Sequence, residues 1–236
     1  MTTKLKKQIE KGLEVSWSPE QIYGRYQLEP KPMVAFKTIY NWLYAGLIDL
    51  DLSVLRRKGK TRQSKETRGT FRINTSIAKR PKGFRNRETF GHWVLDTVVP
   101  SRGNSKDMER KTRFYLAFKI PDRTAKSMFL AIKQLCKLFP KEALKTFTSD
   151  RGKEFACYPL VENLGISFFF ADAYSSWKRG SNENANGLLR EYFPKKTDLA
   201  TISYKTLDKA LYEINHRPRK CLAYRTACEA LEDEFE

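Results

Sequence analysis

Three carboxylates lie at positions where a charged side chain requires a physical explanation. Asp96 interrupts an apolar run from Trp93 to Val99, and burying a charge is costly unless a partner or a metal compensates for it. Asp150 ends a predicted strand and begins a tight turn, and Glu183 lies early in a predicted helix. Because sites in open α/β sheets gather where strands end, we treat these three residues as a candidate site.

Three oxygen-donor side chains from two strands and a helix can converge on two Mg²⁺ or Mn²⁺ ions, since hard cations prefer oxygen ligands. Two ions about 3.5–4 Å apart stabilise the attacking and leaving oxygens of an in-line phosphoryl displacement. Each residue also has a simpler explanation. Asp96 can face solvent on an edge strand, Asp150 can cap the next helix, and Glu183 can complement the positive end of its helix dipole.

The charge balance favours a polyanionic partner. The 236 residues carry 45 Lys and Arg against 27 Asp and Glu, a net charge of +18. Basic side chains that neutralise phosphates release condensed counterions, so nucleic acid is the expected partner. No apolar run approaches the roughly 20 residues that span a bilayer, which argues against a membrane protein. The four cysteines form no Cys-x-x-Cys pair, which predicts a cytoplasmic chain without a zinc site.

The elements that must position the candidate site indicate an α/β fold. Strands are predicted at 93–99, 114–120, 147–150 and 166–170, and helices at 124–139, 180–192 and 207–215, with another helix ending at 164. This alternation is typical of a sheet covered by helices. Residues 100–112 contain no apolar run, so no strand is predicted there. We therefore expect the 114–120 strand to shift beside the first strand, or that sheet edge to stay open.

Two short helices are predicted before residue 48. The run Ser18-Pro19-Glu20-Gln21 has the form of a helix start with a capping box, and this helix is expected to reach Tyr26. After a break at 30–32, a second helix fits 36–44. The pair suits a helix-turn-helix whose second helix enters the major groove, or equally a plain helical hairpin. The candidate DNA-reading residues are Lys37, Thr38, Tyr40 and Asn41.

Charged residues dominate the segment between the two regions. It is predicted to be a basic linker that can follow a DNA backbone, and its candidate DNA-binding residues are Arg56, Arg57, Lys58 and Lys60. Little in it can build a core. The expected organisation is a helix-turn-helix-like segment at 1–54, a linker at 55–89 and a catalytic domain at 90–236.

Several motifs resemble those of one family, the insertion sequence thirty family of bacterial transposases. They are Gly91-His92-Trp93 with Asp96-Thr97-Val98-Val99, the run Thr148 to Phe155, the run Tyr174-Ser175-Ser176-Trp177-Lys178-Arg179-Gly180-Ser181-Asn182-Glu183, and Asn215 to Lys220. Ser16 to Ile22 and Lys37 to Trp42 resemble the family's second helix-turn-helix. The resemblance spans about residues 14–230, and the Tyr174 to Glu183 run is its most specific part.

The resemblance implies an RNase H-like core of the retroviral integrase type, in which Asp96, Asp150 and Glu183 are catalytic and hold two Mg²⁺ or Mn²⁺ ions. The implied reaction is hydrolysis at a transposon end, followed by attack of the freed 3′-hydroxyl on target DNA. It also implies a homo-oligomer on double-stranded DNA in the bacterial cytosol. Further DNA-binding candidates are Trp177, Lys178, Arg179, Asn182 and Arg190. Trp177 can stack on a displaced base or cap the core instead.

The chain departs from the family pattern in four places. Val94 stands where the family has Glu, and the expected second strand has no apolar run. Asp150 and Glu183 are 33 positions apart (183 − 150), one fewer than in the family, and the chain begins at what resembles the second helix-turn-helix. These departures make a DNA-binding remnant that does not cut the alternative to an active transposase. A general nuclease of the same fold is a third possibility, which the long Tyr174 to Glu183 match disfavours.

Overall fold

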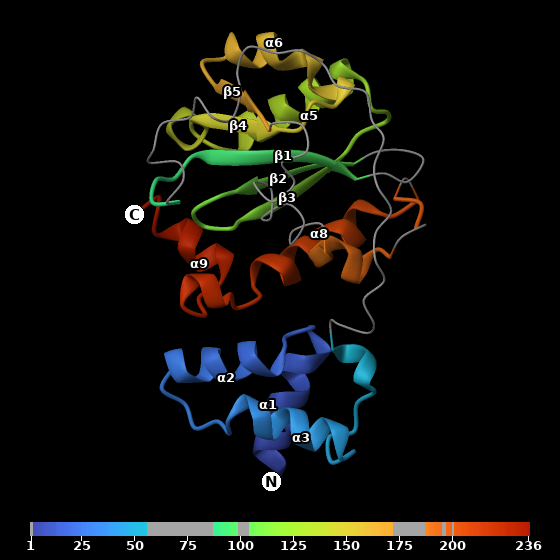
Figure 1. The fold of residues 1–236 in the computed structure, drawn as a ribbon, viewed down its shortest axis with the longest axis vertical. Coiled ribbons are helices and arrows are strands. Elements are labelled where there is room, and N and C mark those ends of the chain that lie inside the picture. The colour runs from blue at the N-terminus through green and yellow to red at the C-terminus, as the bar shows by residue number, and fades with distance from the viewer. Residues whose placement is uncertain (1, 56–86, 99–103, 172–186, 195–196, 200) are drawn as a thin grey trace. The chain divides into compact units, whose positions relative to one another are not determined.

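The computed structural model describes residues 2–55, 87–98, 104–171, 187–194, 197–199 and 201–236. The chain forms two compact units: unit 1 comprises residues 1–66 with 215–236, and unit 2 comprises residues 67–214. Figure 1 shows the elements of each unit by colour along the chain. The predicted boundaries at 54 and 89 stay a prediction, because most of the predicted linker lies outside the described residues.

Unit 2 is built on a five-stranded sheet with the order β3-β2-β1-β4-β5. Its strands are β1 (His92–Val98), β2 (Asn104–Glu109), β3 (Tyr115–Lys119), β4 (Thr146–Ser149) and β5 (Ser167–Phe170). Strands β1, β2 and β3 form an antiparallel meander. Strand β4 lies parallel to β1, and β5 lies parallel to β4. The sheet is therefore mixed, and β1 lies at its centre.

Strand β2 shows that the expectation of no strand within 100–112 was wrong. It pairs with β1 through a register in which Trp93 lies opposite Glu109 and Val94 opposite Met108. Strand β3 pairs with β2 and not with β1, so it has not shifted and β1 has no open edge. The sequence misled because strand formation depends strongly on the neighbouring strands. A polar segment between two strands gains a full hydrogen-bonding ladder without an apolar run of its own.

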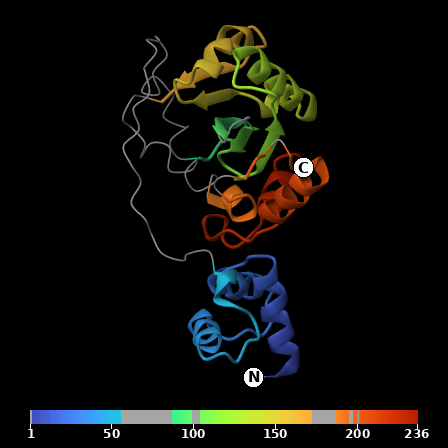
Figure 2. The same ribbon diagram turned by 90° about the vertical axis from the view of Figure 1, so that its right-hand side faces the viewer.

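Helices cover both faces of this sheet (Figures 1 and 2). One face packs against α5 (Ala125–Leu138), the 3-10 helix η4 (Lys153–Cys157) and α6 (Tyr158–Glu162). The other face packs against helical residues 187–192 and α8 (Tyr204–Asn215). Both cores are rich in Leu, Ile and aromatic side chains, which accounts for the apolar spacing in the sequence.

The other predicted elements of unit 2 are mostly confirmed within three residues. The helix predicted to end at 164 is instead η4 followed by the short α6, because Pro159 suits the first turn of a new helix rather than the interior of a long one. Of the predicted helix at 180–192, the structure describes 187–192 as helical. The remaining short helices of the two units are 3-10 turns: η1 (Leu52–Val54), η3 (Lys141–Ala143) and η6 (Lys220–Leu222).

Unit 1 contains three helices near the N-terminus, α1 (Thr3–Glu14), α2 (Pro19–Leu28) and α3 (Phe36–Tyr44). The predicted capping box is confirmed: the Ser18 hydroxyl accepts from the Gln21 amide at 3.3 Å, and the Gln21 side chain accepts from the Ser18 amide at 2.8 Å. Helix α2 extends two residues beyond the predicted end, and α3 has the predicted bounds. The helices share a small core of Ile9, Leu13, Ile22, Ile39, Leu43 and Ile48. No helix among the described residues is long and apolar enough to cross a bilayer.

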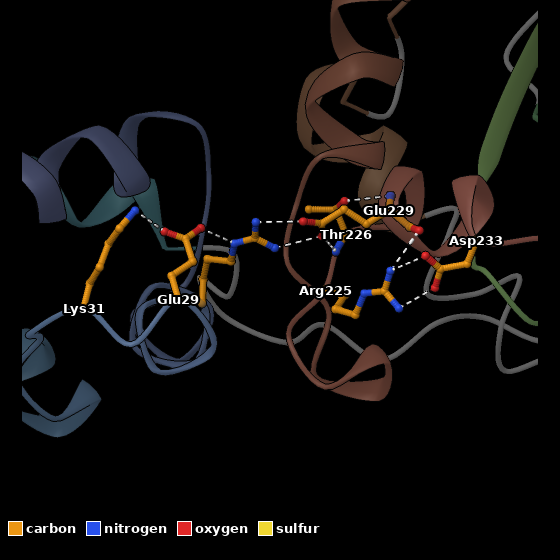
Figure 3. A network of polar contacts seen from close by, with 7 residues as sticks. Glu29, Lys31, Arg225, Thr226, Glu229 and Asp233 are labelled. Carbon is orange, nitrogen blue, oxygen red and sulfur yellow. Dashed lines mark hydrogen bonds and ion pairs between the residues drawn. The ribbon is translucent and has the colours of Figure 1, made fainter. Parts of the chain in front are cut away.

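The C-terminal part of unit 1 contacts one side of α2. The Gln21 side-chain amide donates to the Pro218 carbonyl at 2.6 Å, so the residue that caps α2 also binds the C-terminal segment. Arg25 donates two hydrogen bonds of 2.8 Å to Glu229 on α9 (Ala227–Glu232) (Figure 3). The ring of Tyr224 lies against Gly24, and a Cβ added at position 24 would be 2.2 Å from the nearest ring carbon. This contact therefore requires glycine at position 24.

The Arg25–Glu229 pair predicts a pH dependence of the stability of unit 1. The hydrogen bonds from Arg25 lower the pKa of Glu229 from 4.5 to about 2. A carboxylate whose pKa is lowered by folding stabilises the fold above its ordinary pKa, and this contribution is lost as the pH falls toward the lowered value. We expect Glu229→Gln to lower the unfolding midpoint at pH 7, and the difference from wild type to vanish as the pH falls through this window.

Thermal unfolding of the full chain, followed by circular dichroism at several pH values, measures this difference. Glu232→Gln is the matched control, because Glu232 lies exposed on the same helix. An equal midpoint for wild type and Glu229→Gln at pH 7 would show that the ion pair contributes nothing to stability.

Candidate active site

Strands β1 and β4 bring two of the three predicted carboxylates to neighbouring positions. The strands are parallel, and Val94 lies opposite Thr148. Continuing this register by two residues along each segment (94 + 2 and 148 + 2) sets Asp96 level with Asp150, which directly follows β4. Neighbouring strands are about 4.8 Å apart. The two carboxylates are therefore within reach of a shared ion or of two closely spaced ions.

The two aspartates also share a face of the sheet. Successive side chains of a strand point to opposite faces, and Trp93 and Leu95 belong to the core under α5. Asp96 therefore points to the opposite face, as does its neighbour Val94. Phe147 lies in the same core as Trp93, and continuing the same alternation assigns Asp150 to the face of Asp96. The sequence predicted that the two aspartates converge with Glu183 on one site, and the register of β1 with β4 agrees with that prediction for Asp96 and Asp150.

Each aspartate is oriented by a backbone amide close by. The Asp96 carboxylate accepts from the Thr97 amide at 2.9 Å, and the Asp150 carboxylate accepts from the Gly152 amide at 3.0 Å. Both aspartates are half-buried. Carboxylate oxygens are ligands that hard cations such as Mg²⁺ prefer.

The third predicted carboxylate, Glu183, lies outside the described residues. Among the residues that the structure does describe, no group of three or more His, Cys, Asp or Glu side chains is arranged to hold a metal ion. The place of Glu183 beside Asp96 and Asp150 thus stays a prediction.

The predicted DNA-binding residues are only partly described. On α3, Lys37 and Asn41 are exposed, and Thr38 and Tyr40 are half-buried. Tyr40 stacks on the exposed Tyr44, with ring centroids 6.2 Å apart. Arg190 lies half-buried on the 187–192 helix, and burial lowers the pKa of its guanidinium. The others lie outside the described residues: Arg56, Arg57, Lys58, Lys60, Trp177, Lys178, Arg179 and Asn182.

Sequence reasoning missed Glu154, a buried carboxylate that is hydrogen-bonded to Thr97, the residue after Asp96. Its side chain is 3% exposed, and it accepts from the Thr97 hydroxyl at 2.7 Å and from the Arg123 guanidinium. Burial by itself raises the pKa of Glu154, but the hydrogen bonds from Arg123 and Thr97 outweigh it, so the pKa is lowered. The available signal was its position in the run Thr148 to Phe155, from which only Asp150 was selected.

A second overlooked carboxylate, Glu109, supports the start of β1. It is fully buried and accepts from the amides of Gly91 and His92 at 3.2 and 3.3 Å. The Thr112 amide and hydroxyl donate to its other oxygen at 2.7 and 2.9 Å. The run Gly91-His92-Trp93 thus binds Glu109 through its backbone, and it holds the beginning of the strand that carries Asp96.

The chain is similar to transposases of several insertion sequences. It is 34% identical over 246 residues to transposase InsI of insertion sequence element IS30C from Escherichia coli (strain K12). This match covers 97% of this chain and 64% of the relative. It is 35% identical over 240 residues to the transposase of insertion sequence element IS4351 from Bacteroides fragilis, which covers 96% of this chain and 72% of the relative. The chain thus spans roughly two thirds of the length of these curated relatives. No protein-family model matches it.

Among solved structures, the catalytic core domain of BIV integrase is similar to this chain. The TM-score is 0.51 at 23% sequence identity, and the match covers 62% of this chain and 97% of the integrase domain. At this identity the match shows the fold, and it confirms the predicted RNase H-like core. With the relatives from insertion sequences, it leads to one conclusion: the chain belongs to the IS30 family of transposases.

Proposed function

We propose that this chain is a DNA transposase that cuts at the ends of its element and joins the freed 3′-hydroxyl to target DNA. One observation carries the proposal: β1 and β4 are parallel neighbours in an integrase-type sheet, and their register, continued by two residues, sets Asp96 level with Asp150. The relatives support it, because their names describe transposases of insertion elements.

In this proposal Asp96, Asp150 and Glu183 hold two Mg²⁺ or Mn²⁺ ions. The donor set fits such ions, since both described aspartates offer hard oxygen ligands and are half-buried toward the C-terminal ends of β1 and β4. When bound, the ions supply Lewis-acid stabilisation of the attacking and leaving oxygens of the phosphodiester. The chain's own contribution is to hold the carboxylates at a fixed separation, through the register of β1 with β4 and through the backbone bonds of each aspartate.

Double-stranded DNA is the proposed substrate and partner. The net charge of +18 favours a polyanion, and α3 offers exposed polar residues, Lys37 and Asn41, of the kind that contact DNA. Because an element has two ends, we propose a homo-oligomer that binds both. The DNA substrate places the reaction in the bacterial cytosol.

Strand β2 bears on the alternative of a remnant that binds DNA without cutting. That alternative rested chiefly on the expected loss of the strand beside β1. The structure has β2 in that place, paired with six residues of β1 from Trp93 to Val98. The strand that carries Asp96 is therefore supported on both sides, which favours the active enzyme.

An assay on labelled duplexes that carry the element's own ends tests the proposed function. We expect cleavage at the end and strand transfer into target DNA with Mg²⁺ or Mn²⁺, and neither product with a metal chelator. A duplex of equal length with the terminal sequence scrambled is the control. Binding of the ends without cleavage under any of these metals would establish the remnant instead.

A further inference from the structure

Thr97 and Glu154 stand within the family motifs, directly after Asp96 and four residues after Asp150, but the proposed chemistry uses neither of them. We propose that they are positioning residues: their hydrogen bond joins the strand that carries Asp96 to the turn that carries Asp150. This role rests on the proposed function, because it concerns the separation of the two aspartates.

The alternation of β1 explains why Thr97 suits this role. Asp96 points to one face of the sheet, and the next residue, Thr97, points to the other. There the Thr97 hydroxyl donates to Glu154 on η4 at 2.7 Å. A strand anchored through one residue cannot rotate about its axis without breaking that bond. The anchor on Thr97 thus fixes the direction in which Asp96 points.

Glu154 also acts on the turn after β4. A Cβ at Gly152 would lie 2.6 Å from a carboxylate oxygen of Glu154, so the Glu154 side chain lies directly over the turn. Gly152 has a φ of −64°, which any residue adopts, so the turn needs glycine here for space and not for backbone freedom. The Gly152 amide in turn donates to Asp150. The Asp150 turn and Glu154 therefore form one closely packed arrangement.

Arg123 offsets the free-energy cost of burying the Glu154 carboxylate. Its guanidinium donates to the same Glu154 oxygen that accepts from Thr97, and a buried carboxylate needs such compensation. Arg123 directly precedes Thr124, the N-cap of α5. The Glu154 carboxylate thus joins three separate elements: β1, η4 and the start of α5. Metal sites tolerate little displacement of their ligands, which makes this junction important for metal binding.

The test compares Thr97→Val, which removes the hydroxyl, with Thr97→Ser, which keeps it. Mn²⁺ affinity of the full chain is measured by electron paramagnetic resonance, together with the strand-transfer rate, the affinity for end DNA and the unfolding midpoint. We expect Thr97→Val to lower Mn²⁺ affinity and rate by about 10- to 100-fold, as loss of an outer contact to a metal site does. Thr97→Ser is expected to restore both, and DNA affinity to stay unchanged. Thr206→Val, a change at an exposed threonine of the same unit, is the control for a lost hydroxyl.

The outcomes distinguish failure of the positioning role from failure of the proposed function. Wild-type Mn²⁺ affinity in a folded Thr97→Val variant would overturn the positioning role, and so would a Thr97→Ser variant as impaired as Thr97→Val, because keeping the hydroxyl would then not preserve metal binding. A wild-type chain that binds no Mn²⁺ and transfers no strand would overturn the proposed function itself. If Thr97→Val does not fold, Thr97→Ala replaces it: it also removes the hydroxyl that donates to Glu154, and an Mn²⁺ affinity equal to wild type would count against the role.

Discussion

Asp150→Asn is expected to lower the strand-transfer rate by at least about 10³-fold while end DNA still binds with wild-type affinity. A two-ion site supplies several kcal/mol of transition-state stabilisation, and each 1.4 kcal/mol is about tenfold in rate. Asparagine preserves the shape of the side chain and its bond from the Gly152 amide, but it removes the negative charge that binds a cation. Asp96→Asn is expected to have the same effect, because Asp96 lies level with Asp150.

Asp208→Asn is the matched control for this change. Asp208 lies exposed on α8 in the same unit, so this variant removes an equal charge without touching the site. The strand-transfer rate under single-turnover conditions and the affinity for end DNA are measured for all three variants. A wild-type rate in Asp150→Asn would show that Asp150 is not part of the catalytic site, whatever the family of the chain.

Glu109→Ala is expected to lower the free energy of unfolding of unit 2 by about 3–5 kcal/mol. Glu109 is fully buried and accepts four hydrogen bonds, two from the start of β1 and two from Thr112. Truncation leaves these buried donors without their acceptor, and each unsatisfied donor costs roughly 1–3 kcal/mol before the surroundings relax. Because net stability is only about 5–15 kcal/mol, the loss should be visible as a reduced yield of folded protein.

Urea unfolding of the full chain measures this effect, with Glu142→Gln as the exposed control. Glu109→Gln separates shape from hydrogen bonding. It keeps one acceptor oxygen for the Gly91 and His92 amides but presents an NH₂ group to the Thr112 amide, which cannot accept from it. We expect an intermediate loss for Glu109→Gln. A change below about 1 kcal/mol for Glu109→Ala, near the centre of the range for ordinary point substitutions, would contradict the importance of this buried carboxylate.

Local patterns in the sequence determined the elements that carry the candidate site. The capping run at Ser18 and the apolar spacing of 36–44 predicted α2 and α3, because helix ends and helix faces depend on residues within one or two turns. The apolar residues around Asp96 predicted β1, and the strand predicted at 147–150 corresponds to β4. The motifs around these residues also sufficed to identify the family, whereas Glu183, in the most specific motif, stays a prediction.

Tertiary structure alone decided the features that depend on partners far away in the sequence. Strand β2 forms because β1 and β3 supply its hydrogen bonds on both sides, and no apolar pattern of its own announces it. The Thr97–Glu154 bond spans 57 residues and the Gln21–Pro218 bond spans 197. Such pairs are set by how strands and helices pack, and the same residue types occur at many other positions. The sequence by itself therefore determined which carboxylates to examine, and the strand register determined that Asp96 and Asp150 lie side by side.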